Sequence, residues 1–140
     1  MANIIPTAFK TELLSGTHNF ANGGNSFKIA LYTSNPYDAT STTYSTSNEV
    51  SSTNTSYAAG GQVLDSQAVA ASSTTGHVDF ADETFASVTL TAAFAAIYND
   101  TNSDKLCLVL DFGGNKTATN GDFVVQFPSP NANDAIIRIA

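Results

Sequence analysis

The chain has 140 residues, a formal net charge of −7 and only five basic residues. This size predicts one domain over residues 1–140, and the charge disfavours nucleic acid and anionic membranes as partners, because both are bound through basic patches. Charged residues make up 12% of the chain, about half of the usual share, so Ser, Thr and Asn must solvate most of the surface.

The N-terminal residues predict an extended arm at 2–5 followed by one short helix. Pro6 suits the first turn of a helix, where its missing N–H is not needed, and Phe9 and Leu13 share one helical face. The next element is Phe27–Tyr32, in which apolar side chains alternate. This alternation predicts a β-strand with one buried face.

A long polar segment, residues 33–61, follows this strand and contains mostly Ser, Thr, Asn, Ala and Tyr. A loop of this length inside a compact domain is either functional or disordered, and its tyrosines argue against disorder. The side chains of Tyr37, Tyr44 and Tyr57 each combine an apolar face with a polar tip, which suits protein–protein contact. The segment therefore predicts a surface that meets a partner.

Gly60 and Gly61 end this segment. A tight turn with positive φ is the favoured interpretation, and close approach of the backbone to a partner is the alternative. Further strands are predicted at 63–69, 77–80, 85–90, 94–98, 106–112, 123–127 and 135–139, with a helical turn as the alternative for the alanine-rich residues 92–97. The strand at 106–112 is predicted to be central, and 113–121 to be a loop. About eight short strands with one N-terminal helix predict an all-β protein, an antiparallel β-sandwich for which the jelly roll is one option.

No group of residues predicts catalysis, a metal centre or a cofactor. His18 and His77 are isolated in the sequence, and Cys107, the only cysteine, lies in an apolar run. The carboxylates at 79, 82 and 83 are typical of a solvated turn. Residues 100–104 imitate the start of a calcium loop, but Lys105 replaces the glycine that such a loop needs. No signal peptide or bilayer-spanning run is found, so folding in a cytoplasm is expected.

Four stretches of the chain resemble, in their order, a group of small virion proteins of tailed bacteriophages. They are Ile-Pro-x-x-Phe-Lys-x-x-Leu-Leu-x-Gly at 5–16, Phe-Lys-Ile-Ala-Leu-Tyr at 27–32, Asn-Glu-Val with Tyr-x-x-Gly-Gly-x-x-Leu at 48–64, and Ile-Tyr-Asn-Asp with Asp-Phe-Gly at 97–113. The similarity covers most of the chain. Some members of this group look like capsid cement, or head-decoration, proteins.

The resemblance implies a β-sandwich on the exterior of an assembled phage head, made in the cytoplasm of the host bacterium. The protein would bridge subunits of the major capsid protein as a symmetric homo-oligomer, a dimer or a trimer, without enzymatic activity. The candidate contact residues are those of the arm and the tyrosines of the polar segment: Ala2, Asn3, Ile4, Ile5, Tyr37, Tyr44 and Tyr57.

Two other functions remain open from the sequence. A tail, fibre or receptor-binding component of the virion is the main alternative, because all-β domains rich in Ser, Thr and Asn are common there too. The absence of Trp weakens a carbohydrate-binding role slightly. An enzyme such as a small hydrolase is disfavoured, because the chain shows no recognisable catalytic motif.

Overall fold

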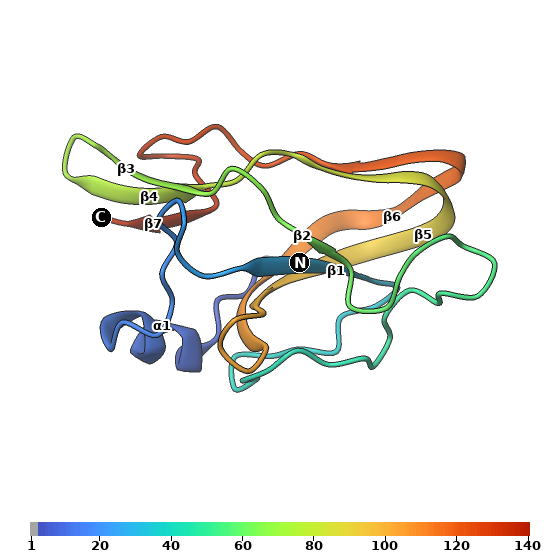
Figure 1. Cartoon of the computed structure of the whole chain (residues 1–140), viewed down its shortest axis with the longest axis horizontal. Coiled ribbons are helices and arrows are strands. Elements are labelled where there is room, and N and C mark those ends of the chain that lie inside the picture. Colours follow the sequence, from blue (N-terminus) through green and yellow to red (C-terminus); the bar gives the residue numbers. More distant parts are fainter. Residues whose placement is uncertain (1–2) are drawn as a thin grey trace.

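A computed structural model describes residues 3–140 and shows an all-β protein with one short helix (Figure 1). Its elements are α1 (Thr7–Leu14), β1 (Phe27–Tyr32), β2 (Gln62–Val63), β3 (Ala68–Ser72), β4 (Thr75–Asp79), β5 (Glu83–Asn99), β6 (Lys105–Val125) and β7 (Ile137–Ile139). Two antiparallel sheets have the strand orders β2-β1-β5-β6 and β3-β4-β7. The predicted all-β class and N-terminal helix are confirmed, whereas the jelly-roll connectivity stays a prediction.

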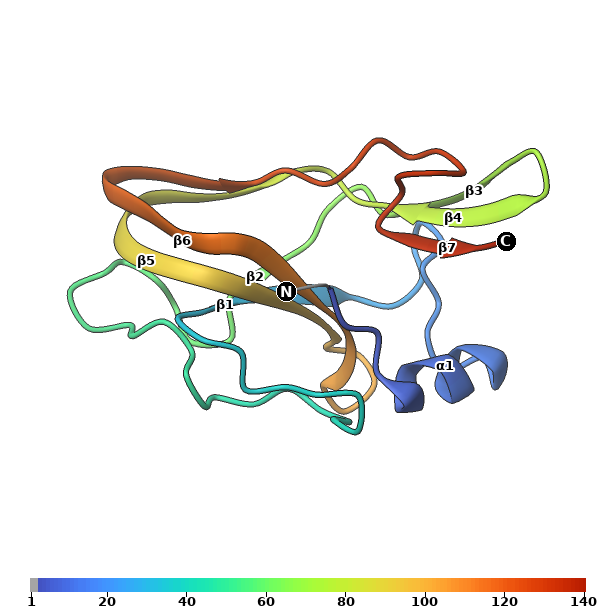
Figure 2. The same cartoon turned by 180° about the vertical axis from the view of Figure 1, so that it is seen from behind.

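Strands β5 and β6 form one long hairpin that bends over itself, so that its two halves lie in different layers (Figures 1 and 2). At the bend, Ala92 pairs with Lys116 and Phe94 pairs with Asp111, so one residue of β5 lies opposite four residues of β6. The additional residues give β6 the longer path that the outer strand of a bend requires. This single hairpin therefore connects the two layers of the sandwich.

The hairpin corrects two predictions about strand boundaries. The predicted strands at 85–90 and 94–98 are parts of β5, and the predicted loop at 113–121 lies inside β6. Gly113 and Gly114 have φ values of 79° and 142° and lie in the bend. Glycines inside a bent strand give the same sequence pattern as a loop. The predicted strand at 63–69 is instead divided into β2 and β3, with Ser66 between them at a φ of 55°.

The main hydrophobic core lies between the two layers. Phe27, Ile29 and Leu31 of β1 reach it from one side, and Phe80 and Phe85 reach it from the other. All five side chains are at most 2% exposed, as the alternation in β1 predicted. Burying such side chains supplies most of the free energy that holds a small sandwich together.

A second hydrophobic cluster lies on the opposite face of the four-stranded sheet, where Ala30 and Tyr32 of β1 pack beside Tyr98 and Leu106. Residues 33–61 run across this face and cover it (Figures 1 and 2). The polar segment is therefore a third layer of the domain. It explains why β6 is buried on both faces from Leu106 to Leu110, although β6 lies at the edge of its sheet and is not central as predicted.

Candidate functional site

The layer formed by residues 33–61 is attached to the sheet through its backbone. The Val50 amide donates to the Leu31 carbonyl at 3.0 Å, and the Leu106 amide donates to the Thr42 carbonyl at 3.0 Å. These bonds join the layer to β1 on one side and to β6 on the other. Backbone groups of the segment thus pair with β1 and β6 much as irregular strands would. This pairing explains why the segment has a defined structure despite its polar composition.

The carboxylate of Glu49 is the centre of the side-chain contacts that hold this layer. Its Oε2 accepts hydrogen bonds from the Tyr57 hydroxyl at 2.6 Å and from the Gly60 amide at 2.7 Å, and its Oε1 accepts one from the Tyr44 hydroxyl. We call these four residues the Glu49 network. Hydrogen bonds to a charged acceptor are roughly twice as strong as neutral ones. The network therefore joins the middle and the end of the segment.

The tyrosines of the network remain protonated donors. Burial first, and then the hydrogen bond to Glu49, raise the pKa of the Tyr57 hydroxyl far above its ordinary value. The same two causes raise the pKa of Tyr44. The Tyr57 oxygen also accepts the Leu31 amide at 3.0 Å. Because neither phenol loses its proton in the ordinary pH range, neither places a second negative charge beside Glu49.

A neighbouring set of contacts fixes the beginning of the layer. The hydroxyls of Tyr32 and Tyr37 lie 2.6 Å apart, and the Tyr32 hydroxyl donates to the Ser45 carbonyl at 2.7 Å. The Ser45 amide donates to the Tyr37 oxygen at 2.9 Å. These buried polar atoms are therefore paired with one another, as buried polar groups must be.

The two glycines that end the segment form the tight turn that the sequence favoured. Gly60 and Gly61 have φ values of 90° and 78°, and the Gly61 amide donates to the Ala58 carbonyl at 2.9 Å. The close backbone approach is made within the chain. A Cβ added to Gly61 would lie 1.8 Å from the Ile29 carbonyl oxygen of β1. The Tyr98 hydroxyl donates to the Gly60 carbonyl at 2.6 Å and holds the turn against the sheet.

The three tyrosines expected to form an exposed contact surface lie mainly inside the protein. Tyr37 and Tyr57 are 6% and 3% exposed, and the half-buried Tyr44 ring stacks on Tyr98 with the ring centroids 4.6 Å apart. The expectation of exposed rings is thus corrected. The polar tips find their partners in Glu49 and in the backbone, so the rings attach the layer. Its exposed side consists mainly of Ser, Thr and Asn, with Asp38 and the alanines at 39, 58 and 59.

The N-terminal arm is attached to the same sheet. Ala2 lies outside the described residues. Ile4 pairs with Val109 of β6 through amide–carbonyl bonds of 3.0 and 2.8 Å, and its side chain packs on the second hydrophobic cluster. Asn3 is exposed, and Ile5 is 37% exposed. The arm covers the edge of β6 and leaves these two side chains at the surface.

The arm and the 33–61 layer lie side by side. The Thr7 amide, at the start of α1 just after the arm, donates to the Ala39 carbonyl of the layer at 3.0 Å. Two segments that the sequence proposed separately as contacts thus form one continuous surface over the outer face of the four-stranded sheet. Nothing in the sequence spacing indicated that they would be neighbours.

A buried polar network that the sequence did not predict lies beneath α1. His18 is 5% exposed, and its Nε2 lies 3.1 Å from Glu12 Oε1, while its Nδ1 lies 3.0 Å from Asn99 Nδ2. One tautomer satisfies both contacts: Nε2–H donates to Glu12, and Nδ1 accepts from Asn99. Cys107 Sγ lies 3.8 Å from the same Nδ1. His18 is far from Asn99 and Cys107 in sequence, so only the folded topology brings them together.

The set Cys107, His18 and Glu12 has the composition of a nucleophile, a base and an orienting carboxylate. A catalytic cysteine requires access and a lowered pKa. Cys107 is fully buried, and burial raises the pKa of its thiol well above the ordinary value. Burial acts to raise the pKa of Glu12, but hydrogen bonds from Lys105, at 2.9 Å, and His18 outweigh it and lower that pKa. The network is suited to tying α1 to the β5–β6 turn.

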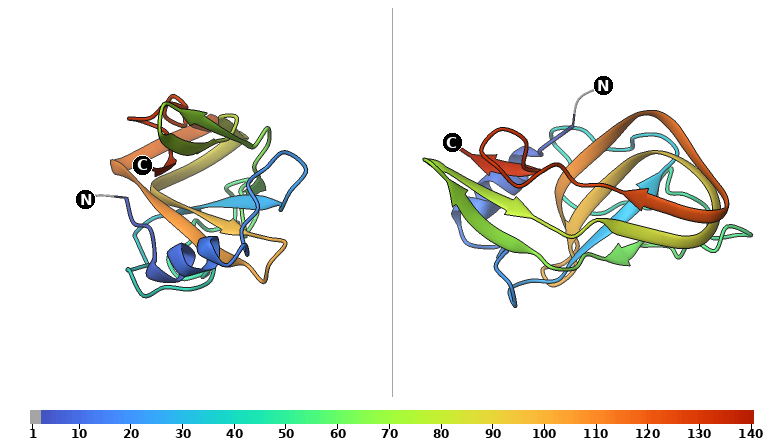
Figure 3. Two further views of the ribbon diagram at one scale, coloured as in Figure 1. Left: turned by 90° about the vertical axis from the view of Figure 1, so that its left-hand side faces the viewer. Right: turned by 90° about the horizontal axis from the view of Figure 1, so that it is seen from above.

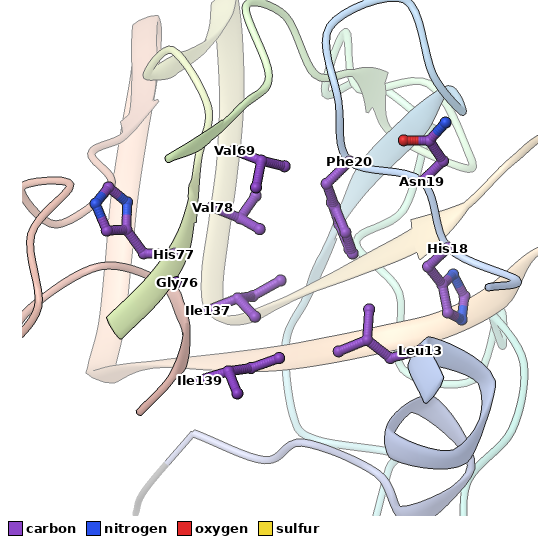
Figure 4. A pocket seen from close by; sticks show the side chains of 10 residues that line it. All are labelled: Leu13, His18, Asn19, Phe20, Val69, Gly76, His77, Val78, Ile137 and Ile139. Carbon is purple, nitrogen blue, oxygen red and sulfur yellow. The ribbon is translucent and has the colours of Figure 1, made fainter. Parts of the chain in front are cut away.

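An apolar groove of about 270 Å³ lies beside this network, between α1 and the inner face of the β3-β4-β7 sheet (Figure 4). Leu13 and Phe20 line one side, and Val69, Val78 and Ile137 line the other. Among residues 3–140, no cluster of three or more His, Cys, Asp or Glu side chains could hold a metal ion. Over the same residues, no helix is long and apolar enough to cross a membrane.

Comparisons with protein-family models, with curated proteins and with solved structures gave no match.

Proposed function

We propose that this chain is a capsid cement protein: a non-enzymatic virion protein that binds the outside of a phage head and stabilises contacts between capsid subunits. The observation that carries the proposal is the role of the resembling motif at 48–64. Glu49, Tyr57, Gly60 and Gly61 together attach the outer layer to the sheet. The resembling motif therefore has a structural role in this chain, which supports the proposal of a common fold with those virion proteins.

The surface chemistry of the outer layer supports the same proposal. Residues 51–54, Ser-Ser-Thr-Asn, are all exposed, and Asp38 is the one charged side chain among the exposed positions of 33–61. Such a surface loses little solvation free energy when it packs against a protein, because few charges must be stripped of water. The net charge of −7 favours solubility before docking.

The partner would be the major capsid protein, and its contacts would come from the exposed side of the outer layer and from Asn3 and Ile5 of the arm. The buried tyrosines would contribute indirectly, by holding that layer in place. A protein that binds the assembled lattice and not the separate subunits stabilises the lattice by mass action, with about 2.7 kcal/mol per site at a free concentration of 100 Kd. No chemical step is needed for this function.

Binding to heads that lack this polypeptide tests the proposal. Added protein should saturate the heads in a simple ratio to the major capsid protein and should raise their thermal disruption temperature. Ile5→Asp should weaken binding, because it places a charge in the contact surface. Val124→Asp is the matched control, since Val124 is 49% exposed on the far half of β6, and it should bind like the wild type. Absence of saturable binding would contradict the proposal, and equal effects of the two variants would reject the arm as a contact.

A further inference from the structure

Strand β3 is an open edge of the three-stranded sheet. It pairs with β4 on one side only, and its other side faces outward (Figure 3). Ser72 and Thr75 flank a two-residue turn and are opposite each other in the register. Hydrogen-bonded and non-hydrogen-bonded pairs alternate along an antiparallel ladder. The N–H and C=O groups of Val69 and Ala71 must therefore point away from β4, towards the open edge.

Several other strand edges of the described residues are covered, short or charged. The first part of β6 is bridged by Ile4 and Thr43, and its part beyond the bend carries Lys116 and Asp122. Strand β2 has two residues, and β7 has three, one of which is Arg138. In contrast, β3 has five residues without charge or proline, and Val69 is 58% exposed. Proteins normally blunt such edges, because an uncharged open strand pairs readily with another.

We propose that β3 pairs antiparallel with β3 of a second copy of this chain, about a two-fold axis through Ala70. This register places Val69 of one copy opposite Ala71 of the other. It is the symmetric register in which both residues with outward-pointing groups exchange hydrogen bonds across the axis. The two sheets then join as β7-β4-β3-β3-β4-β7. The inference goes beyond the proposed function, which does not require self-association, and it names the surface through which two copies would meet.

The side chains of β3 favour a second copy as the occupant of this edge. In the symmetric pair, Val69 meets an alanine, and Ala68 lies opposite Ser72, so only small or apolar side chains face each other. No like charges are brought opposite each other, which matters for copies that each carry a net charge of −7. Five residues on each side bury less than a standard interface of about 1,600 Å². The dimer is therefore reversible and depends on concentration.

Sedimentation equilibrium of the purified protein over micromolar to millimolar concentrations tests this dimer. Ala71→Pro removes the outward N–H without removing a bond to β4. Each dimer then loses two hydrogen bonds, so the dissociation constant should rise about tenfold or more. Ala71→Ser keeps the N–H and should dimerise like the wild type. Val69→Lys, which alters no backbone group, should also dissociate the dimer, and it replaces the proline variant if that variant does not fold.

A wild-type protein that stays monomeric over this range would overturn the inference. So would folded Ala71→Pro and Val69→Lys variants that dimerise as the wild type does, because the copies would then meet through another surface. The head-binding experiment separates this inference from the proposed function. A protein that is monomeric in solution but still saturates heads leaves the cement function standing and removes only the β3 pairing.

Discussion

Replacing Gly61 with alanine should destabilise the protein by more than about 3 kcal/mol, or prevent folding, because a clash adds to backbone strain. The φ of Gly61 is 78°, and the new Cβ would lie 1.8 Å from the Ile29 carbonyl oxygen and 2.9 Å from Ala30 Cα. Both obstacles are backbone atoms of β1, which pairs on both sides and cannot move away. Denaturant unfolding of the purified variant measures the effect.

Gly16→Ala is the matched control for this experiment. Gly16 has a φ of 79°, nearly that of Gly61, but an added Cβ would have no atom within 4 Å. Its replacement should therefore lower the free energy of unfolding by only about 1 kcal/mol, the cost of holding alanine in the left-handed conformation. The difference between the two variants isolates the contact of the turn with β1. Equal losses of stability would mean that the 33–61 layer does not press against the sheet at this point.

Replacing Glu49 with glutamine should lower the free energy of unfolding by about 2 kcal/mol, the typical cost of leaving a buried donor without an acceptor. The carboxylate accepts from Tyr44, Tyr57 and the Gly60 amide. An amide group has only one acceptor oxygen, so at least one of these donors loses its partner. Glu49→Ala should lower the free energy of unfolding further, because all three donors then lose their acceptor.

Hydrogen exchange locates the effect of the Glu49 substitutions. The amides of Val50 and Leu106, which bond across the boundary of the layer, should exchange faster, while amides that pair β5 with β6 should change little. Asp38→Asn, an exposed change in the same segment, should leave both sets unchanged. Uniform loss of protection would instead indicate global unfolding. If Glu49→Gln were as stable as the wild type, the Glu49 network would not contribute to the stability of the fold.

Much of the fold could be predicted because periodicity reports burial directly. The helix followed from the spacing of Phe9 and Leu13, and β1 followed from its alternation; Phe9 and the alternating residues of β1 are buried. The bend of the long hairpin could not be predicted, since Gly113 and Gly114 are equally compatible with a loop. Burial on both faces also does not identify a central strand, because a covering layer has the same effect on β6.

The 33–61 segment stays a predicted contact surface, but the burial of its tyrosines could not be predicted from the sequence. The sequence around a tyrosine in a polar stretch is the same whether its hydroxyl bonds to a partner protein or to an internal carboxylate. Nothing in the sequence therefore indicated that Tyr57 is buried. The contact of His18 with Cys107 joins residues far apart in sequence. Only the path of the β5–β6 hairpin determines that contact, and local spacing carries no information about it.

Counting this polypeptide in separated heads and tails of purified virions, by quantitative mass spectrometry, tests the cement function most directly. We expect copies on heads in a simple proportion to the major capsid protein and none enriched on tails. That ratio would also give the symmetry class of the binding site. A few copies confined to tails would contradict the cement function in favour of a tail, fibre or receptor-binding role, and absence from both fractions would contradict any structural role in the virion.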